Sequence, residues 1–143
     1  MNQIKRVISL LVFLTIVLAG CSSQETIQFS EVWARPGLVG GNSAVYFVVS
    51  NPLDIEEKIL SVSSDIAAAV EIHKSSMVDD VMKMEKQDFV LLPGGEDVLF
   101  QPGGLHIMLI GLEKDLNFDD TFKVIFILEN EGEVVIDVIV KEQ

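Results

Sequence analysis

The chain has 143 residues, a formal net charge of −12 and one cysteine, Cys21. This length is enough for one domain with a substantial hydrophobic core. The acidic balance argues against a nucleic-acid partner, because phosphate binding requires basic patches. A single cysteine also excludes a disulfide framework within the chain.

A signal peptide is expected at residues 1–20. Lys5 and Arg6 are the only charged residues there, and an apolar run from Val7 to Ala19 follows them. This run is too short to favour a membrane-spanning helix. It ends in Leu18-Ala19-Gly20-Cys21, which resembles the lipobox of bacterial lipoproteins, although an ordinary secretory signal with a chance cysteine is the alternative. The resemblance implies that Cys21 is acylated and becomes the first mature residue.

A lipidated tether is expected at residues 21–26, where small polar residues follow the cysteine, and a folded domain is expected at residues 27–143. The lipid would anchor this domain to the membrane. The predicted location is the outer face of the bacterial cytoplasmic membrane, or a periplasmic face.

The domain is predicted to be all-β. Short runs of β-branched and apolar residues alternate with polar ones and are separated by glycine and proline, which is typical of a sandwich or barrel. Turns are expected at 93–95, 102–104 and 130–132, and a short helical turn at 64–68. Strands are expected at 27–34, 44–50, 58–63, 69–73, 82–85, 97–101, 106–112, 121–129 and 133–140.

Histidine and methionine gather in one quarter of the chain. Imidazole and thioether are ligands that suit Cu(I), whereas a thioether is a poor ligand for Mg²⁺, Ca²⁺ or Zn²⁺. Such donors are neutral and need no thiolate. Both histidines and every methionine except Met1 belong to this group: His73, Met77, Met82, Met84, His106 and Met108.

Strand alternation groups some of these side chains. Residues two apart on a strand share a face, so His106 and Met108 point the same way. The same rule separates His73 from the apolar side chains beside it. It does not choose between Met82 and Met84, which share a face.

The spacing of four of these residues completes a longer pattern. Ten residues separate His73 from Met84, twenty-one separate Met84 from His106, and one separates His106 from Met108. This resembles the periplasmic Cu(A) chaperone family, PCuAC, whose motif is His-x10-Met-x21-His-x-Met. The resemblance extends from about Ile27 to Val140. The flanking segments that agree are Val32-Trp33-Ala34-Arg35, Ala44-Val45-Tyr46-Phe47 and Pro102-Gly103-Gly104-Leu105.

The resemblance implies a cupredoxin-like Greek-key sandwich that binds one Cu(I) ion through His73, Met84, His106 and Met108. It implies a copper chaperone rather than an enzyme. Copper would be delivered towards the dinuclear centre of cytochrome c oxidase, with an oxidase subunit or another copper chaperone as the acceptor. The alternatives are a lipoprotein for copper uptake or storage, and a structural surface lipoprotein that binds no metal. An enzyme that uses the same histidines, a copper oxidase or a zinc hydrolase, is a further alternative, which the methionines argue against.

Two departures from the family pattern affect the expected site. Lys74 stands where many members have a methionine, and a His- and Met-rich tail does not follow Val140. We therefore expect one high-affinity site. Met77 and Met82 are interpreted as core filler or as peripheral exchange ligands, and Trp33 as a core residue.

Overall fold

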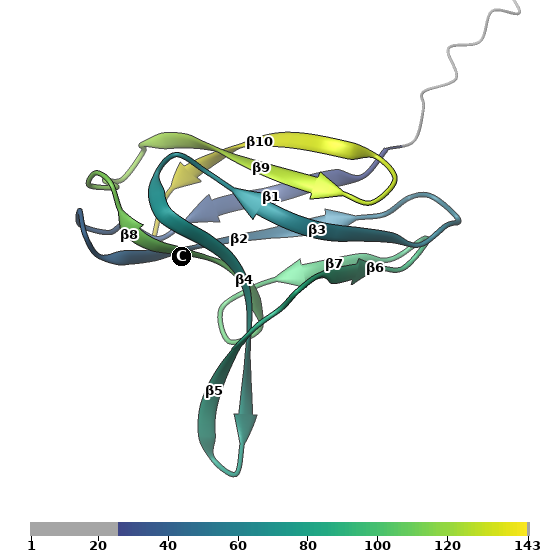
Figure 1. Ribbon diagram of the computed structural model, residues 1–143, viewed down its shortest axis with the longest axis horizontal. Helices are drawn as coiled ribbons and strands as arrows, with labels where there is room; N and C mark the ends of the chain where they lie inside the picture. Colours follow the sequence, from purple (N-terminus) through teal and green to yellow (C-terminus); the bar gives the residue numbers. More distant parts are fainter. Residues whose placement is uncertain (1–25, 143) are drawn as a thin grey trace, which may run out of the picture.

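Ten β-strands form one continuous sheet in residues 26–142, the part of the chain that the computed structural model describes (Figure 1). The all-β prediction is confirmed. The strand order in the sheet is β5-β4-β8-β7-β2-β1-β10-β9-β3-β6. The strands are β1 (Gln28–Ala34), β2 (Asn42–Ser50), β3 (Glu57–Ser63), β4 (Ala67–Val78), β5 (Val81–Lys86), β6 (Val90–Leu92), β7 (Asp97–Phe100), β8 (Leu105–Leu112), β9 (Thr121–Leu128) and β10 (Gly132–Val140).

The predicted signal peptide and Cys21 lie outside the described residues. No helix within residues 26–142 is long and apolar enough to cross a membrane.

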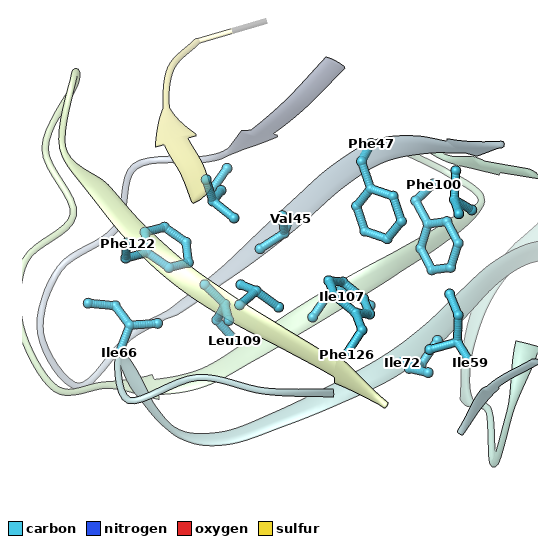
Figure 2. Packing of buried hydrophobic residues seen from close by; sticks show 14 of the residues in the cluster. Val45, Phe47, Ile59, Ile66, Ile72, Phe100, Ile107, Leu109, Phe122 and Phe126 are labelled. Carbon is cyan, nitrogen blue, oxygen red and sulfur yellow. The ribbon is translucent and has the colours of Figure 1, made fainter. Parts of the chain in front are cut away.

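The sheet folds around a single large core. Alternate residues of its strands turn inward, as period-two patterning requires. On β2 these residues are Val45, Phe47 and Val49, all nearly inaccessible to solvent. Phe47 stacks on Phe100 of β7 with ring centroids 4.2 Å apart, and meets Phe126 of β9 edge-on at 5.4 Å (Figure 2). Strands β2, β7 and β9 therefore share one apolar interior.

Strand β2 connects two regions of the sheet. Its first half pairs with β8 and its second half with β7, so these two strands follow one another along β2. Strand β8 then pairs with β4 on its other side. This arrangement places β8 between β2 and β4, with one face of each strand turned away from the core.

The β4–β5 hairpin projects from the body of the molecule (Figure 1). Residues 67–74 of β4 pair with β8, whereas residues beyond Lys74 pair only with β5. Every residue of β5 is exposed. Asp79 and Asp80 form the turn with φ angles of 51° and 61°, the left-handed conformation that two-residue hairpin loops favour and that aspartate tolerates.

Three local predictions need correction. The segment at 64–68 is not helical: β4 begins at Ala67, and the Ser64 hydroxyl donates to the Lys123 carbonyl at 2.6 Å instead of capping a helix. Strand β4 does not end at His73 but continues to Val78, because β5 supplies backbone partners beyond the body of the sheet. Strand β6 was not predicted, since three residues are too short to show a period. The turns predicted at 93–95, 102–104 and 130–132 are confirmed.

A buried carboxylate joins the start of β3 to the β9–β10 turn. Glu57 is 1% exposed. It accepts hydrogen bonds from the backbone N–H groups of Lys58 at 2.7 Å, Asn130 at 3.1 Å and Glu131 at 3.0 Å. The Glu131 carboxylate in turn accepts from the Ile27 N–H at 3.1 Å, where the folded domain begins. Because N–H bonds to a charged acceptor are stronger than neutral ones, Glu57 fixes this end of the sheet.

Replacing Glu57 by glutamine should lower the free energy of unfolding by about 1–3 kcal/mol, because an amide group would face N–H donors that the carboxylate now satisfies. Denaturant unfolding measures the change. The matched control is Glu56→Gln at the exposed neighbour, which should stay within about 0.5 kcal/mol of the parent protein. Equal effects of the two substitutions would contradict a special role for Glu57.

Candidate metal centre

The two histidines lie directly opposite each other on neighbouring strands. His73 of β4 and His106 of β8 are register partners, and their ring centroids are 5.9 Å apart. The next pair in the ladder, Ile72 and Ile107, points to the other face and is buried in the core (Figure 2). Core packing behind the ladder therefore holds the two imidazoles side by side on its outer face.

The two methionines of the predicted quartet share this face. Met108 is two residues beyond His106 and pairs with Ala44 of β2. Met84 of β5 pairs with Ser75, which is two residues beyond His73 on β4. The four predicted residues thus come from three adjacent strands and point to the same side of the sheet.

A pocket of about 400 Å³ opens on this face, and His106, Met84 and Met108 are among its lining residues. His73 does not line the pocket but stands beside it, against the His106 ring. The exposure of the four side chains differs: His106 is buried at 4%, His73 and Met108 are partly buried, and Met84 is 50% exposed. The arrangement therefore combines one buried and one partly buried imidazole with one partly buried and one half-exposed thioether.

A backbone carbonyl determines which nitrogen of His106 is free. His106 Nδ1 lies 3.1 Å from the Gly104 carbonyl oxygen. A carbonyl oxygen can only accept, so Nδ1 carries the hydrogen and Nε2 keeps its lone pair. Burial lowers the pKa of His106, the Gly104 carbonyl opposes this shift, and His73 and Arg35 add to it. The ring therefore stays neutral to lower pH than an exposed histidine, which a metal ligand requires.

A carboxylate favours the opposite tautomer for His73, with the hydrogen on Nε2. Its Nε2 lies 2.8 Å from Glu71 Oε2, and Lys86 Nζ lies 2.6 Å from the other Glu71 oxygen. The hydrogen bond from Lys86 is the main cause that holds the pKa of Glu71 below its usual value, and the hydrogen bond with His73 is the second. Within residues 26–142, the buried Nδ1 of His73 has no hydrogen-bond partner. Because an unpartnered buried nitrogen is costly, this atom is suited to a ligand.

The two rings thus offer different nitrogens, Nδ1 from His73 and Nε2 from His106. Metal-binding histidines usually donate their second ring N–H to a carboxylate or a backbone carbonyl. Glu71 and Gly104 occupy these two roles. Together with the two thioethers, the neutral nitrogens form a donor set that matches a soft monovalent ion such as Cu(I).

Aromatic side chains border the pocket on the β2 side. The Tyr46 ring centroid is 6.3 Å from that of His106 and 4.7 Å from that of Trp33, and the Arg35 guanidinium lies 5.3 Å over Tyr46. Trp33, Ala44 and Tyr46 form a small buried cluster separate from the main core. Trp33 is thus buried, as predicted, but near the site. Tyr46 is a site neighbour that the sequence did not predict, although alternation along β2 places it on the same face as Ala44.

The core interpretation of Met77 and Met82 is wrong. These side chains are 64% and 61% exposed on the projecting hairpin, and Met82 lines the pocket beside Met84. Both lie where the hairpin has left the body of the sheet, so neither can fill the core.

Among residues 26–142, no three His, Cys, Asp or Glu side chains are grouped so as to hold a metal ion.

The hydrogen bonds predict opposite tautomers for the two histidines. At a pH that keeps both rings neutral, His73 should carry its hydrogen on Nε2 and His106 on Nδ1. Long-range ¹H–¹⁵N NMR correlations of the metal-free protein distinguish the two forms. Glu71→Ala should convert His73 alone to a mixture of tautomers and leave His106 unchanged. If both rings have the same tautomer in the parent protein, the nitrogen assignment is wrong.

Sequence comparisons place the chain in a family. The family model described as lipoprotein LpqE-like matches residues 27–140. RP573 of Rickettsia prowazekii (strain Madrid E), described as an uncharacterized protein, is 34% identical over 121 residues, covering 81% of this chain and 67% of that protein.

Three solved structures extend the comparison. The copper-bound PCuAC domain from PmoF2 is 25% identical with a TM-score of 0.68, covering 82% of this chain and 93% of that one. The metal-free form of the same domain is 26% identical with a TM-score of 0.66, covering 80% and 89%. CuI-DR1885 from Deinococcus radiodurans, at 19% identity, TM-score 0.60 and coverage of 89% and 87%, is similar in fold alone. The predicted cupredoxin-like fold is confirmed, and the chain belongs to the LpqE-like family.

Proposed function

We propose that this protein binds one Cu(I) ion through His73, Met84, His106 and Met108 and carries it as a copper chaperone, not as an enzyme. The observation that carries the proposal is the pair of facing imidazoles. Each has its second nitrogen hydrogen-bonded elsewhere, and two thioethers share their face. Similarity to a copper-bound PCuAC domain supports the choice of copper.

The accessibility of the donors supports transport over permanent storage. A carrier must exchange its ion with a partner, which requires a ligand that the partner can reach. Met84 is half-exposed and lies on an edge strand whose residues are all exposed. A thioether is neutral and polarizable, so its replacement by another neutral soft donor, such as a partner's methionine, leaves the charge around the ion unchanged.

We further propose that Cys21 is lipidated and anchors the domain on the outer face of the bacterial cytoplasmic membrane, or on a periplasmic face. The Leu18-Ala19-Gly20-Cys21 sequence supports this, and the family description also refers to lipoproteins. At that surface the acceptor would be the cytochrome c oxidase subunit with the dinuclear copper centre, or another copper chaperone.

The copper proposal predicts tight binding of one Cu(I) at the quartet and much weaker binding of Cu(II), because the donors are soft and neutral. Competition titrations against chelators for each oxidation state measure both affinities. Met84→Leu roughly preserves side-chain bulk while removing sulfur. It should weaken tight Cu(I) binding by more than about 100-fold, beyond the range for losing an outer-shell contact.

The matched control is Met82→Leu, one strand repeat away on the same face of β5. It should leave the tight affinity near that of the parent protein, and neither variant should change the melting temperature of the metal-free protein, since both side chains are exposed. A preference for Cu(II), or loss of tight binding in Met82→Leu instead of Met84→Leu, would overturn the ligand assignment.

Replacing Cys21 by serine should abolish lipid attachment while leaving copper binding intact, because Cys21 precedes the folded domain, which begins at Ile27. Labelling of cells with a radioactive fatty acid reports the lipid, and Cu(I) titration of the purified variant reports the site. Continued fatty-acid incorporation in Cys21→Ser would refute the lipobox assignment.

A further inference from the structure

Two methionines outside the proposed quartet face each other near the end of the β4–β5 hairpin. Met77 and Met82 are register partners on antiparallel strands, so their Cβ atoms are about 4.5–5.5 Å apart and their long side chains can reach a common point. Both side chains are more than 60% exposed. The position therefore presents two thioethers to solvent as a pair.

This pair continues the face that carries the proposed copper ligands. Along β5, Met82 and Met84 are two residues apart on one side, a separation of about 7 Å. Along β4, Met77 follows Ser75 and His73 at the same interval, and Ser75 is the partner of Met84. Met82 also lines the pocket that contains Met84, His106 and Met108. Methionine positions on one face thus lead from the hairpin to the pocket.

The hairpin has little structural reason to carry these residues. A two-stranded hairpin is marginally stable in water unless it packs against something, and all six residues of β5 are exposed. Exposed methionines do not contribute to the core. The turn beyond them consists of Asp79 and Asp80, whose negative charge raises the local concentration of cations at the tip.

We propose that Met77 and Met82 form a second, weaker Cu(I) site through which the ion reaches the quartet. The inference rests on the proposed function. Two neutral donors in an open position bind Cu(I) less tightly than four donors, the two imidazoles and two thioethers at the pocket and beside it. Transfer then proceeds by ligand exchange: Met84 binds the ion while Met82 still holds it, and Met77 dissociates. Met82 then dissociates as His73, His106 and Met108 complete the quartet. Copper remains Cu(I), so no oxidant or reductant is needed.

The test compares the parent protein with the double variant Met77→Leu/Met82→Leu, which removes both sulfur atoms and keeps the apolar bulk. Titration with Cu(I), with X-ray absorption at each equivalent, should show a tight first site and a weak second site bound by sulfur in the parent protein. The double variant should lose the second equivalent, keep the first affinity, and load more slowly from a Cu(I)–chelator complex in stopped-flow measurements.

The neighbouring pair Val78 and Val81, also register partners at the tip, provides the control. Val78→Thr/Val81→Thr makes the tip more polar without touching sulfur and should keep both equivalents and the loading rate. A second equivalent and a loading rate that survive in the methionine double variant would overturn the inference, as would a parent protein with one equivalent only.

The proposed function fails separately. If the weak, sulfur-dependent equivalent is present but no tight site exists, the second site stands and the quartet assignment is wrong. Met84→Leu gives the complementary result when both proposals hold: it loses the tight site and retains the weak one.

Discussion

The antiparallel register of β4 against β8 is the constraint on which the candidate site depends. It sets His73 opposite His106 on one face and Ile72 opposite Ile107 on the other. A slip of one residue would turn His73 into the core and expose Ile72. Since burying an isoleucine side chain contributes about 1.5–3 kcal/mol, the apolar face strongly resists such a slip. Packing of the apolar side chains on the other face of β4 and β8 therefore fixes the relative position of the two imidazoles.

The thioethers are held less firmly than the imidazoles. Met108 lies on β8, between β2 and β4, whereas Met84 lies on β5, an edge strand that leaves the body of the molecule. Segments with few buried contacts open at low free-energy cost. In the proposed chaperone, the imidazoles would define the position of the ion and Met84 would be the ligand that yields first to an acceptor. Stable holding and easy release are thus assigned to different strands.

Much of this arrangement could be predicted from the sequence, for reasons that are local. Period-two alternation identified the strands around Phe47, His106 and Phe126, and it placed His106 and Met108 on one face. Contacts made across the sheet could not be predicted in this way. The bond from Lys86 to Glu71 joins residues 15 positions apart that alternation does not connect. Alternation also cannot tell whether a strand lies against the body of the sheet, which is why the sequence left Met77 and Met82 open between core filler and peripheral exchange ligands.

The net charge of the protein and the donor atoms of the proposed site act differently on metal ions. A net charge of −12 attracts every cation, including Mg²⁺ and Ca²⁺, and so gives no selectivity. The proposed donors are neutral because they are imidazole nitrogens and thioether sulfurs. The one carboxylate beside them, Glu71, is hydrogen-bonded to Lys86 and His73. Hard cations require oxygen ligands, whereas nitrogen and sulfur donors favour Cu(I). In the proposed site, the softness of the donors would therefore decide which ion binds, and not the net charge that attracts cations to the surface.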